Sequence, residues 1–248
     1  SHGYPALYMP ASGAPAQFRI GENPYGPSLY GWIVEIDPHD PSAAPKKRTA
    51  LGRKKNECAN TAIGRDGRVA VYTGDDQRGE HLYKFVTRGR FDPNNRAANM
   101  DLLDEGDLYA AQFLEDGQGR WIKLTVEAAN RAAEEQESPI RFADQGDLVM
   151  RVRDAARFLG ATPMDRPEDV EPSPVSGKVY IACTKNADRD RHSRRGAFNG
   201  REIDFGAPAI NDPGFAAARE QVYASDRQML RDTDTGFKWL SKNEAGER

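Results

Sequence analysis

Short runs of β-forming residues, each closed by a turn rich in Gly or Asp, limit this fold more than any other feature. Residues 31–36 form one such run, ended by Asp37 and Pro38. Residues 68–73 form another, with Asp66 and Gly67 before it and an acidic Gly-containing turn after it. The 23 Gly and 16 Pro are spread so evenly that no 18-residue apolar stretch or long heptad seam occurs. The pattern therefore favours antiparallel sheets and excludes a transmembrane helix or a coiled coil.

Residue periodicity places the individual elements. Alternating or continuous apolar runs predict strands at 33–36, 69–73, 82–86, 108–113 and 179–183, with a further strand at 121–124. Helical spacing of apolar residues predicts a helix over 148–159, which Gly160 would end. Residues 215–230 suggest a second helix, and 126–136 fit either a short helix or a surface loop. The expected fold class is mainly β, an incomplete β-propeller-like set of antiparallel sheets with a few helical insertions.

The propeller interpretation comes from a repeat. Ile33, Val71 and Tyr109 are each 38 residues apart, close to the roughly 40 to 45 residues of a four-stranded propeller blade. A β-sandwich can imitate three such instances, so both architectures stay open on spacing alone.

The composition of the chain limits the kinds of partner that it can bind. The chain has 248 residues, 38% of them hydrophobic, which is enough for a sizeable core. Its 35 basic and 38 acidic residues nearly balance, so no overall field attracts nucleic acid or a membrane surface. Cys58 and Cys183 are too few for a disulfide framework and are expected to be free thiols. The first residues carry no export signal, which would have been removed or lie upstream.

Acidic residues in unusual settings are the candidate functional groups, because the common nucleotide-binding, serine-hydrolase and zinc motifs are absent. Glu57 is the one acid in the polar stretch 54–60, which by itself is better explained as a solvated loop. Asp75 and Asp76 directly follow a strand, where they could bind calcium or simply form a hairpin turn.

A third segment, 164–171, places an arginine and a glutamate on either side of a proline. Pro167 fixes its own φ and biases Arg166 towards an extended conformation, so that Arg166 and Glu168 have a defined geometry. A guanidinium suits phosphate oxygens, and a carboxylate suits a metal ion that polarises the same phosphate. A structural salt-bridge loop is the alternative.

Five ordered motifs, matching from about Tyr30 to Asn186, resemble the PhoX family of alkaline phosphatases. They are Tyr-Gly-Trp-Ile-Val-Glu-Ile-Asp-Pro at 30–38, Lys-Arg-Thr-Ala-Leu-Gly-Arg at 47–53, the strands at 71–76 and 82–86, Leu-Asp-Glu-Gly at 103–106, and Gly-Ala-Thr-Pro-Met-Asp-Arg-Pro-Glu-Asp-Val at 160–170. The family's upstream segment, with a metal-binding Cys and a Pro-Trp-Gly-Thr motif, does not precede Tyr30. Asn56 stands where the family commonly has His, and Cys58 where it more often has Gly.

The resemblance implies a secreted β-propeller, periplasmic or extracellular, that hydrolyses phosphate monoesters with calcium and ferric iron. It makes Glu57, Asp76 and Glu168 metal ligands, with Asp75 a further candidate, and Arg166 the contact to phosphate. Arg166 and Glu168 would then be the catalytic pair. If these acids bind the same metal ions, their side chains must lie close together in the fold. Such a cluster of negative charges is costly unless cations neutralise it.

Domain organisation follows from the same motifs. Residues 1–29 form an irregular lead-in, 30–186 the propeller blades, and 187–248 a polar loop and helical C-terminal segment. The chain is expected to be the C-terminal part of such a phosphatase, partnered by the missing N-terminal part or a second chain that covers its sheet edges. Two rival functions remain: a non-catalytic binding module, which needs neither metal, and a structural domain that binds calcium without iron.

Overall fold

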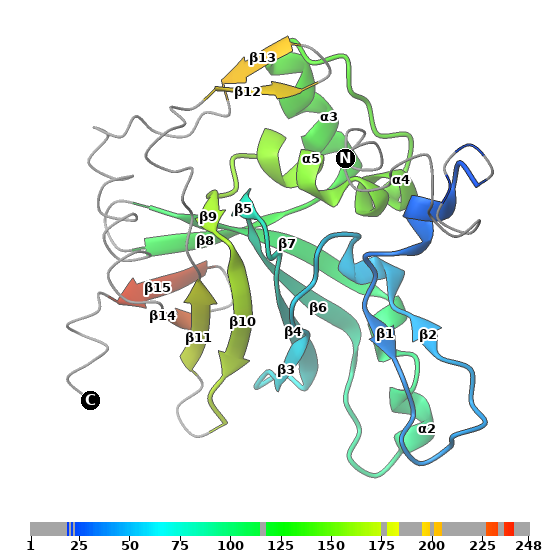
Figure 1. Cartoon of the computed structure of the whole chain (residues 1–248). Coiled ribbons are helices and arrows are strands. Elements are labelled where there is room, and N and C mark those ends of the chain that lie inside the picture. Colours follow the sequence, from blue (N-terminus) through cyan, green and yellow to red (C-terminus); the bar gives the residue numbers. More distant parts are fainter. Residues whose placement is uncertain are drawn as a thin grey trace.

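The structure of the chain, a computed structural model, is mainly β (Figure 1). It describes residues 19, 21, 23–114, 118–174 and 178–183, and four further strands at 195–198, 201–204, 227–232 and 236–240. Antiparallel sheets with a few helices make up this part of the chain, which confirms the expected fold class. The described helices are all too short or too polar to span a lipid bilayer.

The main sheet has nine antiparallel strands among the described residues, in the order β10-β11-β14-β15-β8-β7-β6-β4-β3. These are β3 (Asn60–Ile63), β4 (Arg68–Gly74), β6 (Leu82–Arg90), β7 (Gly106–Phe113), β8 (Gln118–Lys123), β10 (Pro167–Pro172), β11 (Lys178–Cys183), β14 (Arg227–Asp232) and β15 (Gly236–Leu240). Three two-stranded sheets pair β1 (Val34–Glu35) with β2 (Lys46–Lys47), β5 (Arg78–Glu80) with β9 (Met164–Asp165), and β12 (Arg195–Phe198) with β13 (Arg201–Asp204).

The meander from β3 to β8 follows from alternating side chains and tight turns. Val71 and Tyr83 pack in one hydrophobic cluster, whereas their neighbours Tyr72 and Leu82 pack in another on the opposite face. Between β3 and β4 the chain reverses at Gly67, whose φ of 82° lies in the region that favours glycine. The turn residues and the alternating burial along each strand thus favour the same pairing register between neighbouring strands of the meander.

Three helices cover one face of the meander (Figure 1). They are α3 (Val126–Glu135), α4 (Gln145–Met150) and α5 (Val152–Phe158). The side chains of Thr125 and Asp144 cap α3 and α4 by accepting hydrogen bonds from the backbone NH groups of Ala128 and Asp147. A shorter helix, α2 (Arg96–Asn99), and 3-10 turns at Gly26–Leu29, Thr49–Leu51 and Leu102–Asp104 lie in the connections.

The two ends of the main sheet lie beside each other. The Asn60 side chain of β3 donates a hydrogen bond of 2.9 Å to the backbone oxygen of Val170 in β10. The Val170 NH in turn donates to Cys58 Sγ at 3.2 Å. Side chains rather than a backbone ladder therefore join β10 to β3, and this seam brings residues near 57, 75 and 167 together.

Several expectations need correction. The helix expected over 148–159 is two helices, because Arg151 leaves helical geometry (φ −116°, ψ 38°) while pairing with Asp147. Residues 227–230, expected at the end of a helix over 215–230, form part of strand β14 instead, because they pair with β11; positions 215–226 lie outside the described residues. The spacing of 38 does not mark separate blades, since Val71 and Tyr109 share one sheet with β6 between them.

Other expectations are confirmed. Strands cover 69–73, 82–86, 108–113, 121–123 and 179–183, and 126–135 is a helix rather than a loop. Of the run 33–36, only Val34 and Glu35 pair, with the two lysines of β2. Cys58 and Cys183 are free thiols.

Candidate active site

Three segments far apart in sequence meet at one end of β4. The loop before β3 runs beside the turn after β4, with an isolated bridge between Asn56 and Asp75. The Glu57 NH donates to the Gly74 oxygen at 3.2 Å, and the Asp76 NH donates to the Lys55 oxygen at 2.9 Å. The third segment is the junction of β9 and β10, which pairing of β9 with β5 fixes beside this turn.

Gly74 permits the close approach of β4 and β10. A Cβ atom built at Gly74 would lie 2.3 Å from the backbone oxygens of both Pro167 and Glu168, far inside any real contact. No other residue type fits here without displacing β10. The position of Arg166 and Glu168 against the acidic turn therefore depends on this glycine.

Arg166 bridges the acids of two segments. Its Nη2 lies 2.8 Å from Asp76 Oδ2 and 3.1 Å from Glu168 Oε1, so the two carboxylates share one nitrogen. The hydrogen bond that Arg166 donates to Asp76 contributes most to raising the pKa of Arg166 above its usual value, which keeps the group cationic. Its side chain is 35% exposed, and Nε and Nη1 make no hydrogen bond within the described part of the chain.

The backbone of Arg166 differs from the expectation. Its φ is 53°, in the left-handed region, although a residue before proline was expected to be extended. Such a conformation in a non-glycine residue costs of order 1–3 kcal/mol and persists only where the surrounding contacts enforce it. Here the chain is fixed on both sides of Arg166, by the pairing of β9 with β5 and of β10 with β11, and its side chain forms ion pairs with Asp76 and Glu168.

Glu57 completes the acidic group. Partial desolvation raises the pKa of Glu57, and the charges of Asp76, Glu168 and Asp169 raise it further, while Arg166 opposes them. These interactions place Glu57 within electrostatic range of the other acids. The structure thus brings Glu57, Asp76, Arg166 and Glu168 together, as the expected convergence requires; their roles as ligands and catalysts stay predictions.

The donor set suits a hard cation in part. Asp76 Oδ1 and Asn56 Oδ1 are buried and accept no hydrogen bond from the residues that the structure describes, and oxygen atoms of this kind are the ligands that calcium prefers. However, no three His, Cys, Asp or Glu side chains in the described ranges are grouped closely enough to hold a metal ion. The Arg166 guanidinium, rather than a metal, lies between the two nearest carboxylates.

Asp75, the further metal candidate, points away from this group. It is fully buried and accepts hydrogen bonds from the Lys55 NH at 3.1 Å and from Arg153, whose Nε lies 2.7 Å from Asp75 Oδ2. A second nitrogen of Arg153, Nη2, donates to Asp75 Oδ1. Within the described residues Asp75 therefore serves as an anchor for α5 and the turn.

Sequence reasoning missed Arg153, although a signal exists. Val149, Val152 and Ala156 form the apolar stripe of the predicted helix, and Arg153 falls on that same stripe. A charge on a core-facing stripe needs a buried partner, and here the partner is Asp75.

Further titratable groups lie buried beneath the turn. Burial raises the pKa of Glu80 to about 7, with Asp75 adding to the effect and Arg153 opposing it. Burial also lowers the pKa of His81 to about 4. His81 Nδ1 lies 2.9 Å from the Thr162 oxygen, so the neutral ring carries its proton on Nδ1.

The fold and the site together define a mainly β protein whose candidate site combines an arginine with carboxylates. This combination suits hydrolases that act on anionic esters. The family model described as alkaline phosphatase PhoX matches residues 7–247, and the chain belongs to this family. The resemblance is thereby confirmed, and the match extends beyond the range 30–186 at both ends.

A solved structure supports the same relationship. The chain is similar to "Pseudomonas fluorescens PhoX in complex with vanadate, a transition state analogue", with 38% sequence identity and a TM-score of 0.69. The match covers 90% of this chain and 37% of that chain, so the present chain spans little more than a third of the solved protein's length. No curated protein matches the chain.

Proposed function

We propose that the protein is a phosphomonoesterase in which Arg166 binds the phosphate group of the substrate. The observation that carries this proposal is the geometry of Arg166. Two carboxylates fix one of its nitrogens, while Nε and Nη1 make no hydrogen bond within the described residues and the side chain is 35% exposed. A guanidinium held in this way presents preorganised donors to an oxyanion at little further entropic cost.

Glu57, Asp76 and Glu168 are the residues that would hold metal ions, which we propose to be calcium and ferric iron. When bound, such ions supply Lewis-acid polarisation of a phosphoryl oxygen. The buried oxygen of Asp76 that accepts no hydrogen bond supports this assignment. Since no three ligands are grouped in the described residues, the site needs a change in the Arg166 bridge or ligands from elsewhere.

In this proposal the protein's own residues divide the work. Arg166 offsets the charge that develops on the phosphoryl oxygens as the ester bond breaks, because its donors are fixed before the reaction. Glu168, whose side chain is 25% exposed, both orients Arg166 and contributes a ligand oxygen. That the related Pseudomonas protein was solved with vanadate supports a phosphate-binding role.

Mutation of the pair tests the proposal in the full-length protein. Arg166→Ala should lower phosphomonoesterase kcat/KM by about 100-fold or more, the scale for losing one preorganised donor, with metal content nearly unchanged. Glu168→Ala should lose metal as well as activity. Arg88→Ala, which removes an exposed arginine paired with Glu105, is the control. Near-normal turnover in a folded Arg166→Ala variant would overturn the phosphate-binding role.

The same measurements separate the rival functions. A non-catalytic binding module would contain neither metal, and a structural calcium domain would contain calcium without iron or activity. A phosphatase needs both metals together with turnover. Following the family resemblance, we also propose that the protein works in the periplasm or outside the cell.

A further inference from the structure

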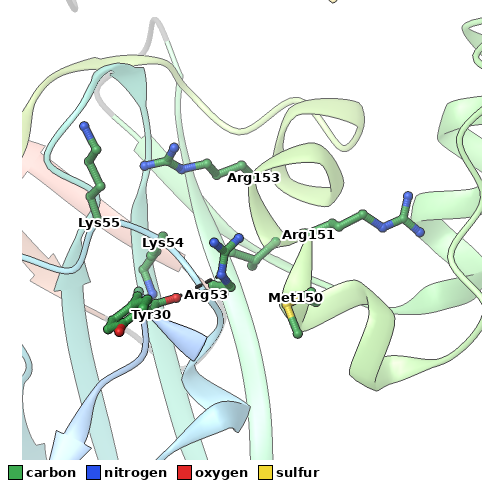
Figure 2. A pocket seen from close by; sticks show the side chains of 9 residues that line it. Tyr30, Arg53, Lys54, Lys55, Met150, Arg151 and Arg153 are labelled. Carbon is green, nitrogen blue, oxygen red and sulfur yellow. Dashed lines mark hydrogen bonds between the residues drawn. The ribbon is translucent and has the colours of Figure 1, made fainter. Parts of the chain in front are cut away.

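A cavity of about 210 Å³ with several basic residues in its lining lies between the loop before β3 and the start of α5. It is bordered by Tyr30, by Arg53, Lys54 and Lys55 of the loop before β3, and by Arg151 and Arg153 at the start of α5 (Figure 2). No acidic residue is among those that line it. Since a water molecule occupies about 30 Å³ of liquid, the cavity has room for a tetrahedral oxyanion.

Arg53 is a partly buried cation without an acidic partner in the described part of the chain. Its Nε donates to the Tyr30 oxygen at 2.9 Å and its Nη2 to the Pro27 oxygen at 2.6 Å, both backbone carbonyls. Burial lowers the pKa of Arg53, and the charge of Arg153 lowers it further. Buried charges are ordinarily paired, so this guanidinium is in a costly position unless an anion joins it.

The neighbouring cations leave this charge uncompensated. Asp75, the buried acid that pairs with Arg153, already accepts hydrogen bonds from Arg153 on both of its oxygens. Lys54 is buried, donates to the Leu51 oxygen at 2.8 Å and lies over the ring of Tyr83. Arg151 points away from the others (Figure 2) and pairs with Asp147.

We propose that this cavity binds a phosphate group, with Arg53 as its principal contact. The guanidinium is weakly hydrated and matches the geometry of phosphate oxygens, so it favours phosphate over a simple halide. The phosphate comes either from free inorganic phosphate or from a second phosphoryl group of a substrate whose first lies at Arg166.

Calorimetric titration of the chain with inorganic phosphate tests the proposal. An Arg166→Gln variant should keep one phosphate site, and adding Arg53→Gln should weaken that site by 10-fold or more. Arg88→Gln, which removes an exposed positive charge elsewhere, should change the affinity less than 2-fold. Arg53→Lys keeps the charge but not the guanidinium fork that holds two carbonyls, so it should bind phosphate less tightly than Arg53 and more tightly than Arg53→Gln.

The outcomes are distinguishable. If Arg53→Gln leaves phosphate affinity unchanged in the Arg166→Gln background, the cavity is not a phosphate site. If phosphate binding vanishes in Arg166→Gln alone, the cavity proposal is overturned while the proposed function stands. A bisphosphate that binds at least 10-fold more tightly than a monophosphate, with the gain lost in Arg53→Gln, identifies the substrate as the source. An Arg53-dependent site without that gain identifies free phosphate.

Discussion

Replacing Asp75 with Asn should lower the free energy of unfolding by about 3 kcal/mol or more, the scale for breaking a buried ion pair. Asp75 is fully buried and Arg153 is 6% exposed, so water cannot replace the lost interaction. Asn keeps one acceptor oxygen, loses one of the two hydrogen bonds from Arg153, and turns a donor towards a donor. The buried arginine would then keep only its longer contact, 3.8 Å from Nε to Glu80 Oε2, as an ion pair.

Urea unfolding measures this cost, and a double-mutant cycle isolates the pair. Asp75→Asn combined with Arg153→Met should be less destabilised than the sum of the single variants, by about 2 kcal/mol. Glu105→Gln, which breaks an ion pair with side chains 70% or more exposed, should cost no more than about 1 kcal/mol.

The unfolding experiment also distinguishes an anchor from a metal ligand. An anchor gives the same Asp75→Asn defect with and without a chelator, since the ion pair needs no metal. If the difference in unfolding free energy between the wild type and Asp75→Asn disappears once metal has been removed, the anchor role is refuted and Asp75 is restored as a ligand.

Two further variants test the turn and its surroundings. Gly74→Ala should destabilise the fold by about 2 kcal/mol or more, since its Cβ would meet the backbone oxygens of Pro167 and Glu168 at 2.3 Å. Gly21→Ala, whose Cβ would have no atom within 4 Å, is the control in thermal melts. His81 has a folded pKa of about 4, below its ordinary 6.5, so the unfolded chain binds the proton first and stability falls as pH drops from 6.5 towards 4. The loss should reach about 3 kcal/mol and be absent from His81→Asn, whose amide can replace the Nδ1 proton donor. Because the raised pKa of Glu80 shifts stability in the opposite sense, the difference between the two proteins is the quantity to measure, and identical pH profiles would contradict the assignment.

The strands of the meander were predictable because burial alternates along them. Val71 and Tyr72 face opposite clusters, as period-2 patterning requires. The same rule applied to the turn would have separated Asp75 from Asp76, one directed inward and one towards Arg166. Treating both acids as ligands overlooked this alternation.

Tertiary contacts explain what the sequence could not supply. The rule for residues before proline indicated an extended Arg166, yet its φ is 53° and its side chain contacts two carboxylates. One of them, Asp76, is 90 residues away, and no local pattern reveals that contact. The split at Arg151 likewise depends on where its guanidinium packs, since it pairs with Asp147 and lies over the ring of Phe142.

The seam between β3 and β10 has a consequence for how the site comes into being. The Asn60 side chain and the Val170 oxygen that it contacts are 110 residues apart, so the seam closes a very long loop. Contacts of high sequence separation slow folding, because the entropy of loop closure is lost before they stabilise the structure. During synthesis Glu57 and Asp76 therefore lack their contacts with Arg166 until β10 has left the ribosome and packed beside β3.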